Sequence, residues 1–440
     1  MGRHRQKRNV QDVAQAVSLH KSGQLDEAER RYRAVLGRQP DNPDALHFLG
    51  LLLHRRGDTA AGTDSVRRAT VADPGYADAF NNLGNLLKLA GQFDEAETAY
   101  RQALRLRPND ANAHSNLGVV LRARGRLAES EAALRQAIAI DERHVPAYTN
   151  LGHVLKRTGR VQEAIGCYRA AIALDPDNPM APRVLGRAYQ ANGEPDKARE
   201  VFLAWIERDP GNPIARHMLS ACSSDAAPAR ASDAYVRTLF DEIADSFDEH
   251  LADLRYRAPQ LIGAAFATAW PQPHGDLDVL DAGCGTGLCA AFLRPQARML
   301  VGIDLSSGML RRAKALNMYD QLIEGELTAF LEGHPDGYDA IVSADTLCYF
   351  GALEGVFKAA AAALRPSGRL FFTVEKATPA AADGYHLQPH GRYDHAPSYV
   401  RRQLEGAGLI VETYQEAALR QEAGTPVPGL VLTATRPACG

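Results

Sequence analysis

A period of 34 residues runs through the first half of the chain and limits what that half can fold into. A Leu-Gly pair recurs at this interval from residue 49 to 186, a second glycine recurs at it from residue 23 to 193, and a proline closes most units. Small residues let two antiparallel helices approach closely, the second glycine ends the first helix, and the proline ends the second helix. One helix pair cannot bury its own apolar face, so the pattern predicts stacked pairs in an all-α superhelix with a concave groove.

The pattern resembles the tetratricopeptide repeat (TPR), a helix–turn–helix unit whose period and small-residue positions it matches. Six repeats start at residues 9, 43, 77, 111, 145 and 179, and a last helix without a partner glycine follows at 213. An Ala/Ser/Pro-rich stretch after that helix predicts a linker. We therefore expect a multidomain chain with a basic tail at 1–8, a TPR array with its capping helix at 9–222, a linker at 223–232 and a second domain at 233–440.

Amide side chains recur at one place in three consecutive repeats and suggest what the groove binds. The residue before the Leu-Gly pair is an asparagine at Asn82, Asn116 and Asn150. In arrays similar to that of O-linked GlcNAc transferase, asparagines at this place hold peptide backbone, since an amide both donates and accepts hydrogen bonds. The same helices carry basic residues nearly two turns later, at Lys88, Arg122 and Lys156. The pattern favours a groove for a protein or an acidic peptide; the alternative is local packing beside a solvated face.

Composition excludes several classes of protein. The 440 residues are 45% hydrophobic and 23% charged with a formal net charge of −3, which gives no signature of nucleic-acid binding. The N-terminus is basic, but no apolar segment follows it, and no apolar run approaches the roughly 18 residues of a membrane span. The six cysteines show no paired spacing, which is typical of reduced thiols. We expect a cytoplasmic protein without nucleic-acid or membrane partners.

The second half alternates short apolar β-type runs with helical patterns, which predicts an α/β domain with a mostly parallel, doubly wound sheet. Ligands of such sheets bind beyond the carboxyl ends of the strands. The first run leads into VLDAGCGTG, residues 279–287, where a glycine loop lets a ligand lie against the backbone. The expected strands are 277–281, 298–303, 320–323, 338–343, 368–374, 409–414 and 429–435.

The glycine spacing and a neighbouring acid distinguish between two cofactor classes. A dinucleotide fingerprint needs glycine at its first, third and sixth places, but the sixth place from Gly283 is Leu288, and the third glycine is Gly287. Asp281 would also repel a pyrophosphate beside this loop. The carboxylate instead suits a ligand that has a cationic end and no phosphate.

The loop resembles the first motif of class I methyltransferases that use S-adenosylmethionine (SAM), a cofactor with an ammonium, a sulfonium and no phosphate. In that family an acid at the end of the second strand, here Asp304, binds both ribose hydroxyls, a bidentate role that suits a carboxylate. The acid or amide that meets the adenine amino group is here Glu326, where aspartate is commoner. The alternative for either acid alone is a helix N-cap or a solvated side chain. The resemblance implies as cofactor-binding residues Asp281, Gly283, Cys284, Gly285, Gly287, Asp304, Leu305, Glu326 and Ser343.

The segments that flank this core, 235–259, 391–409 and 419–430, resemble those of bacterial TPR-containing methyltransferases, which are distantly similar to trans-aconitate and quinone-type methyltransferases. The resemblance implies a Rossmann-like class I methyltransferase domain joined to the TPR superhelix. It predicts a SAM-dependent methyltransferase with an unidentified acceptor, whose array recruits a protein partner or substrate. The alternative is a TPR scaffold whose domain binds SAM without transferring the methyl group.

Methyl transfer requires a positioned acceptor, and it requires a base where the acceptor must lose a proton. Class I enzymes build substrate lids in the insert after the fifth strand. The candidate bases in this insert are His386, His390, Tyr393 and His395. The alternative is that these are loop residues without a chemical role. Three histidines at this spacing lack the close pair and carboxylate of a zinc site, so we expect no metal.

Basic and aromatic residues near both ends of the domain allow an acidic acceptor, because an arginine fork binds a carboxylate. The candidates are Arg392, Arg401, Arg402, Tyr256 and Arg257. A solvated helix face is the alternative for Arg401 and Arg402.

Overall fold

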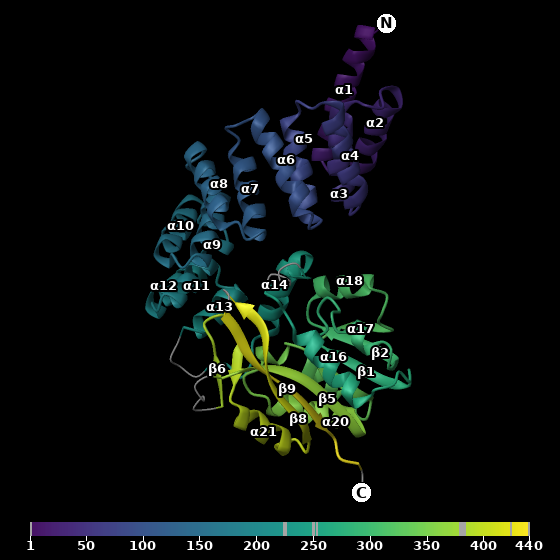
Figure 1. The fold of residues 1–440 in the computed structure, drawn as a ribbon, viewed down its shortest axis with the longest axis vertical. Helices are drawn as coiled ribbons and strands as arrows, with labels where there is room; N and C mark the ends of the chain where they lie inside the picture. The colour runs from purple at the N-terminus through teal and green to yellow at the C-terminus, as the bar shows by residue number, and fades with distance from the viewer. Residues whose placement is uncertain are drawn as a thin grey trace. The chain divides into compact units, whose positions relative to one another are not determined.

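The computed structural model describes residues 2–222, 227–248, 251, 254–377, 384–422 and 425–438. The chain divides into two compact units, Met1–Ala181 and Pro182–Gly440. The first unit is helical, and the second contains a large sheet (Figure 1). The division falls inside the sixth predicted repeat. The predicted linker at 223–232, whose first four residues lie outside the described part, stays a prediction.

The first unit consists of antiparallel helix pairs with the predicted period. Four first helices begin at the predicted repeat starts of 43, 77, 111 and 145. The first helix differs, because it begins at Gly2 and runs through the predicted basic tail. The helices are α1 (Gly2–Lys21), α2 (Leu25–Arg38), α3 (Pro43–Arg55), α4 (Thr59–Ala72), α5 (Ala77–Leu89), α6 (Phe93–Leu106), α7 (Ala111–Ala123), α8 (Leu127–Ile140), α9 (Val145–Arg157) and α10 (Val161–Leu174).

Glycine has both roles that the repeat pattern predicts. A Cβ at Gly84 of α5 would lie 2.6 Å from the ring of Tyr100 in α6, and a Cβ at Gly152 would lie 2.3 Å from Tyr168. Both tyrosines are buried in the contact between paired helices. The other set of glycines adopts positive φ, +69° at Gly91 for example, which ends the first helix of each pair in a left-handed turn.

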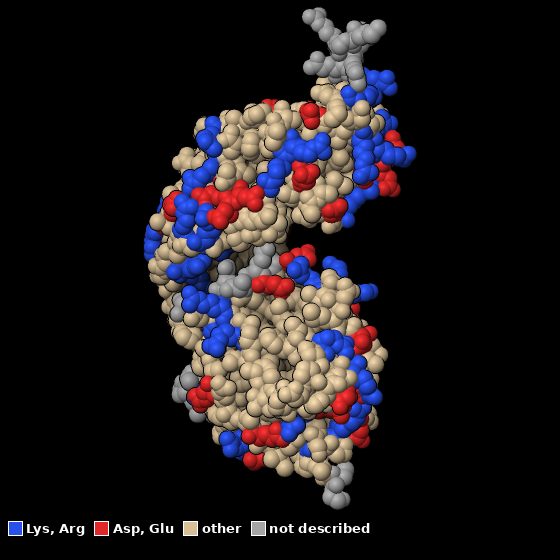
Figure 2. Space-filling view, turned by 45° about the vertical axis from the view of Figure 1, so that its right-hand side comes forward, with Lys and Arg blue, Asp and Glu red and all other residues tan. Residues whose placement is uncertain are grey.

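Ion pairs link neighbouring repeats of the first unit. Glu97 of α6 accepts a hydrogen bond at 2.8 Å from Arg101 of its own helix and one at 2.7 Å from Arg126, which precedes α8. Glu131 pairs with Arg160 in the same way at 2.8 Å. Basic and acidic side chains accordingly intermix on this unit (Figure 2). Exposed pairs contribute little individually, whereas Glu97 is buried and its carboxylate needs these arginines as partners.

The second unit begins with the rest of the sixth repeat. Residues from Pro182 of α11 (Met180–Ala191) belong to it, together with α12 (Pro195–Arg208) and α13 (Pro213–Ser220). The capping helix α13 packs against α14 (Asp233–Ile243), and the ring of His217 stacks on that of Tyr235 with centroids 3.8 Å apart.

The described part of the predicted linker is hydrogen-bonded to the sheet domain. The Ala231 amide donates to the Tyr349 carbonyl at 2.8 Å, and the Gly351 amide donates to the Ala229 carbonyl at 2.9 Å. These bonds form a short antiparallel bridge. The segment thus differs from a free linker, because its backbone polar groups are satisfied by the domain that follows.

The sheet confirms the predicted α/β class. Its nine described strands follow the order β3-β2-β1-β4-β5-β7-β6, with β9 antiparallel to both β5 and β8. All seven predicted strands are present; the hairpin of β6 and β7 was not predicted, because three-residue strands carry no periodic signal. The strands are β1 (Leu277–Ala282), β2 (Ala297–Asp304), β3 (Gln321–Glu324), β4 (Tyr338–Ser343), β5 (Leu364–Lys376), β6 (Tyr385–Leu387), β7 (Tyr393–His395), β8 (Ile410–Glu422) and β9 (Thr425–Thr435). The helices among them are η1 (Ala244–Ser246), α16 (Ala258–Ala269), α17 (Ala290–Leu293), α18 (Ser307–Ala315), α19 (Leu327–Glu332), η2 (Leu347–Tyr349), α20 (Glu354–Ala363) and α21 (Pro397–Gly406).

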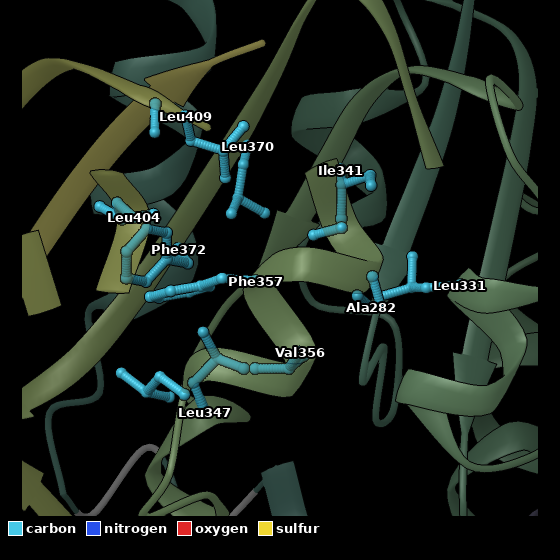
Figure 3. Close-up of a cluster of buried hydrophobic side chains, with 14 of the residues drawn as sticks. Ala282, Leu331, Ile341, Leu347, Val356, Phe357, Leu370, Phe372, Leu404 and Leu409 are labelled. Carbon is cyan, nitrogen blue, oxygen red and sulfur yellow. The ribbon is translucent and has the colours of Figure 1, made fainter. Parts of the chain in front are cut away.

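Apolar layers cover both faces of the sheet. On one face, Phe372 of β5 packs with Phe357 of α20 and Leu404 of α21 (Figure 3). On the other face, Phe371 contacts Phe266 of α16, with ring centroids 5.2 Å apart. Adjacent residues of β5 thus point to opposite faces, as strand geometry requires. With both faces covered, the carboxyl ends of the parallel strands are the place for a ligand.

In the parts of the chain that are described, no helix is long and apolar enough to span a bilayer. The cysteines in these parts are free thiols, at Cys167, Cys222, Cys284, Cys289 and Cys348. Cys439 lies outside the described residues.

Candidate active site

A cavity of about 240 Å³ lies at the carboxyl ends of β1, β2 and β4 in the second unit. It extends from the glycine loop after β1 to side chains of α11, α13, α14 and the insert that contains β6 and β7. The predicted cofactor residues that line it are Asp281, Gly283, Cys284, Gly285, Asp304, Leu305 and Glu326. The structure thus brings most of the predicted cofactor set together.

Gly287 and Ser343 are not among the residues that line the cavity. Gly287 has a φ of +93°, and a Cβ there would lie 2.8 Å from Leu316, so this glycine shapes the turn. The Ser343 hydroxyl donates to the Ala282 carbonyl at 3.1 Å and ties β4 to β1.

The glycine loop has no room for side chains at its start. Gly283 has a φ of +77°, and a Cβ there would lie 2.1 Å from the Thr346 hydroxyl. Gly285 also has a positive φ, of +55°. Cys284 is buried, and burial raises the pKa of its thiol well above the ordinary value, so the thiol is neutral. The loop therefore offers bare backbone to a ligand.

Asp281 is a buried carboxylate at the end of β1, with 1% of its surface exposed. The Tyr319 hydroxyl donates to its Oδ2 at 2.6 Å. Burial raises the pKa of Asp281 to about 7; the Tyr319 hydrogen bond opposes this rise, and the charge of Asp304 adds to it. A cationic ligand would stabilise the ionised form. The sequence did not indicate Tyr319, because it lies in the loop between α18 and β3, outside any motif.

Asp304 at the end of β2 holds two loops. Its Oδ2 accepts from the Gly285 amide, and its Oδ1 accepts from the Ser306 amide, each at 2.9 Å. Asp241 of α14 supports the second loop, because its Oδ1 accepts from the Ser306 hydroxyl at 2.6 Å. Asp304 therefore positions the glycine loop, a role that the sequence did not indicate.

Glu326 is the N-cap of α19, which was the structural alternative to a cofactor role. Its Oε2 accepts from the Ala329 amide at 2.8 Å. Its Oε1 is buried without a hydrogen-bond partner among the described residues, and the nearest cation, Arg230, is 3.7 Å away. One oxygen thus caps the helix while the other is left to accept from an amino group such as that of adenine.

A network of arginines and acids forms another part of the wall. Arg420, with 3% of its surface exposed, donates to Asp345 at 2.9 Å, to Glu422 at 2.8 Å and also to Glu375. Arg392 donates to Glu375 at 2.6 Å and also to Glu422. Buried charges persist here because each has a partner of opposite sign.

The network includes a trio whose geometry approaches that of a metal site. Asp345, Cys348 and Glu375 place ligand atoms within 4.8 Å of one another. Arg420 pairs with both carboxylates, however, and burial keeps the Cys348 pKa well above its ordinary value. The chemistry of the trio fits an ion-pair network, since a cation would compete with the guanidinium.

The structure separates the four candidate bases. His390 lines the cavity with its Nε2 3.6 Å from Glu375 Oε2, and burial followed by the charge of Arg392 lowers its pKa to about 4. The other three do not line the cavity. The His386 side chain is 50% exposed, Tyr393 donates to the Pro228 carbonyl at 2.8 Å, and the buried His395 ring lies 2.8 Å from the Phe350 carbonyl. A catalytic role stays a prediction and is best placed at His390.

Only some of the residues predicted to recognise an acidic acceptor line the cavity. Arg392 and Tyr256 line the cavity, whereas Arg257, Arg401 and Arg402 are exposed and are not among its lining residues.

The predicted groove residues lie at equivalent places of α5, α7 and α9. The side-chain nitrogen of Asn82 is 2.8 Å from His47 Nε2, and that of Asn116 donates to Asn81 at 3.4 Å. Two of the three amides therefore link neighbouring repeats, while Asn150 is partly buried. The basic residues lie in the last turns of the same helices, where a cation also stabilises the helix dipole: Lys88, Arg122 and Lys156.

Family models match both parts of the chain. Residues 239–411 match a methyltransferase domain, and residues 13–77, 81–144 and 149–213 match tetratricopeptide repeats. A ubiquinone biosynthesis O-methyltransferase from Thiobacillus denitrificans is 30% identical over 185 residues, which are 37% of this chain and 79% of that protein. The chain belongs to the class I methyltransferases and carries TPR repeats.

Other similarities are more partial. Methyltransferase-like protein 27 from Homo sapiens is 43% identical over 84 residues, 19% of this chain and 34% of that protein. A malonyl-[acyl-carrier protein] O-methyltransferase from Erwinia pyrifoliae is 30% identical over 25% of this chain and 40% of that protein. The chain thus spans less than half the length of these two relatives. Among solved structures, MamA is 25% identical with a TM-score of 0.35, covering 37% of this chain and 94% of its own, and PilW is 18% identical with a TM-score of 0.45, covering 48% and 98%.

Proposed function

We propose that the chain is a SAM-dependent methyltransferase of the cytoplasm, whose acceptor binds beside the cofactor and whose TPR array recruits a protein partner or substrate. The observation that carries the proposal is the convergence of three acids on one cavity with a bare glycine loop. Asp281, Asp304 and Glu326 follow three neighbouring strands, β1, β2 and β3. Their carboxylates suit, in that order, the ammonium, the ribose hydroxyls and the adenine amino group of SAM.

SAM supplies a methyl group on a sulfonium that needs no further activation, so the residues of this chain have to position the acceptor and exclude water. The part of the cavity beyond the cofactor acids offers Tyr349, Arg392 and His390 to that acceptor. His390 is neutral near pH 7 and is the candidate to take a proton from the acceptor where one must leave.

The proposal is tested by incubating the full chain with methyl-tritiated SAM and a host-cell lysate separated by size into proteins and metabolites. We expect label in one fraction, and much less label at the same SAM concentration when Asp304→Ala replaces the wild type. SAM binding by calorimetry without label in either fraction would support the alternative, a TPR scaffold with a silent domain. Failure of SAM to bind would overturn both the methyltransferase and the silent SAM-binding scaffold.

Replacing the three groove asparagines by alanine is expected to abolish partner capture and to leave SAM affinity unchanged. The chain loses the Asn82–His47 contact and the weaker Asn116–Asn81 contact, so the free energy of unfolding of the array is expected to fall by about 1 kcal/mol. Affinity purification and thermal unfolding check both effects, with Gln136→Ala on an exposed face of α8 as the control. Capture of the same partners as wild type would show that the three asparagines are not part of the binding surface.

A chain that begins near Ser232 is expected to fold and to bind SAM, because the cofactor acids all follow that residue. It loses the contact of His217 with Tyr235, so its melting temperature is expected to lie below that of a chain that begins at Pro182. Calorimetry and thermal unfolding of the two fragments provide the comparison. An insoluble shorter fragment would place the domain boundary earlier.

A further inference from the structure

Two arginines of the last repeat belong to the cavity of the second unit. Arg183 and Arg187 lie four residues apart on α11, so their side chains share one helix face. Both line the cavity, together with Tyr235 of α14 and His390 and Arg392 of the insert. The repeat array therefore supplies part of the wall beside the proposed acceptor.

Arg187 differs from the other arginines of this wall in having no partner. Arg183 donates to Glu242 at 3.2 Å, and Arg392 and Arg420 are paired in the acidic network. Among the described residues, none makes a hydrogen bond or ion pair with the Arg187 guanidinium. Burial and the neighbouring charges of Arg392 and Arg183 lower its pKa, yet an arginine stays protonated in proteins. The charge of Glu422 acts on Arg187 in the opposite direction, but that carboxylate is already paired with Arg392 and Arg420. A partly buried cation beside two like charges is unfavourable until an anion joins it.

The repeat fold does not require these arginines. The two positions carry no arginine, lysine or acid in the five preceding repeats. The pairs that occupy them are Val13 and Val17, His47 and Leu51, Asn81 and Asn85, Ser115 and Val119, and Thr149 and His153. The sixth repeat, whose helices belong to the same unit as the methyltransferase domain, is the one that carries arginine at both.

The surrounding contacts hold this wall in place. His217 of α13 bonds through Nε2 to the Gly391 carbonyl of the insert at 2.8 Å. Gly391 has a φ of +87°, and a Cβ there would lie 2.7 Å from the Tyr235 hydroxyl. The insert, α13 and α14 are thus closely packed against one another, which preorganises a binding site.

We propose that the methyl acceptor carries a small oxyanion that pairs with Arg187 beside Arg183, so that the last TPR repeat supplies the side chain that recognises the substrate. The inference rests on the proposed function and names the substrate class of the same cavity. A guanidinium fork matches both carboxylate and phosphate in a bidentate arrangement. In this proposal Arg187 binds and orients the acceptor, whereas Asp281, Asp304 and Glu326 bind the cofactor.

The test measures binding of small probes to the full chain in the presence of S-adenosylhomocysteine by saturation-transfer NMR. The probes are propionate, methyl phosphate and the neutral propionamide. We expect saturation transfer to propionate, to methyl phosphate or to both, at least tenfold weaker transfer to propionamide, and loss of the anion signal in Arg187→Met. Preference for one anion identifies carboxylate or phosphate as the source. Arg199→Met, which removes the same charge from an exposed site on α12, is expected to keep the signal.

Equal signals for the three probes, no anion signal, or an unchanged signal in Arg187→Met would overturn the inference. Arg187→Lys, which keeps the charge without the fork, gives a second variant if Arg187→Met does not fold, and it is expected to weaken anion binding severalfold. Calorimetric titration of SAM into wild-type protein free of S-adenosylhomocysteine is a separate measurement. SAM binding without anion selectivity refutes this inference alone, whereas absence of SAM binding refutes the proposed function.

Discussion

Replacing Asp304 by alanine is expected to weaken SAM binding by about 1.5–3 kcal/mol, the loss of charge-assisted hydrogen bonds to two ribose hydroxyls. The structure adds a second reason, because Asp304 also accepts from the amides of Gly285 and Ser306 and so holds the glycine loop. Calorimetric titration of SAM into the variant measures the loss. NAD is expected not to bind either protein.

Asp320 provides the matched control for this change. Its carboxylate also accepts a backbone hydrogen bond, from Leu300 at 2.7 Å, but it is not among the residues that line the cavity. Asp320→Ala is therefore expected to change stability and leave SAM affinity within about twofold. Unchanged SAM affinity in Asp304→Ala, or tight NAD binding by the wild type, would contradict the cofactor assignment.

Asp281→Asn is expected to have opposite effects on cofactor binding and on stability. The amide cannot balance the SAM ammonium, so SAM affinity is expected to fall by roughly 1.5–3 kcal/mol. The free chain, in contrast, gains stability above pH 7, by on the order of 1–3 kcal/mol, because a buried charge is removed.

The expected gain in stability of Asp281→Asn follows from the pKa of Asp281, which is raised from 3.8 to about 7 in the folded chain. The folded state holds this proton more tightly than the unfolded state. The stability associated with it is complete below pH 3.8 and is lost as the pH rises to about 7. Denaturant unfolding at pH 5 and pH 8 is expected to show that Asp281→Asn removes this loss.

SAM affinity has the complementary pH dependence. The ionised carboxylate binds the cation, so wild-type affinity is expected to fall by up to about tenfold per pH unit below pH 7. The fall is expected to be absent in Asp281→Asn. In Tyr319→Phe the midpoint moves to higher pH, because the hydrogen bond that lowers the Asp281 pKa is gone. A wild-type affinity that is flat from pH 5 to pH 8 would show that this carboxylate does not meet the cation.

The architecture was predictable because its signals are periodic. The 34-residue repeat fixes the helix pairs of the first unit, and glycines such as Gly84 are required by the close approach of Tyr100. The strands of the sheet are apolar runs bounded by turns, and the three acids that we propose for the cofactor lie at strand ends whose order is set by the doubly wound topology.

The acceptor side was harder to predict because its residues converge from segments far apart in the chain. The sequence predicts one cluster of candidate bases in the insert, but the β6–β7 hairpin places His386 and His395 in different surroundings, and only His390 of the four lines the cavity. Tertiary contacts decide such matters, and loop sequence carries no period.

The contribution of the last repeat left one signal in the sequence. Arg183 and Arg187 stand at positions that carry no arginine, lysine or acid in the earlier repeats. The recurring residues Asn82, Asn116 and Asn150 predict a groove, whereas these two arginines depart from the repeat. A departure at the repeat nearest a domain boundary indicates a contact that the repeat fold does not need.

The most direct test of the central claim is a crystal structure of the full chain with S-adenosylhomocysteine. We predict electron density for the ligand in the cavity of the second unit, with its amino group at Asp281, its ribose at Asp304 and its adenine amino group at Glu326. Density at another site, or a ligand whose ribose and adenine contact none of these acids, would contradict the account.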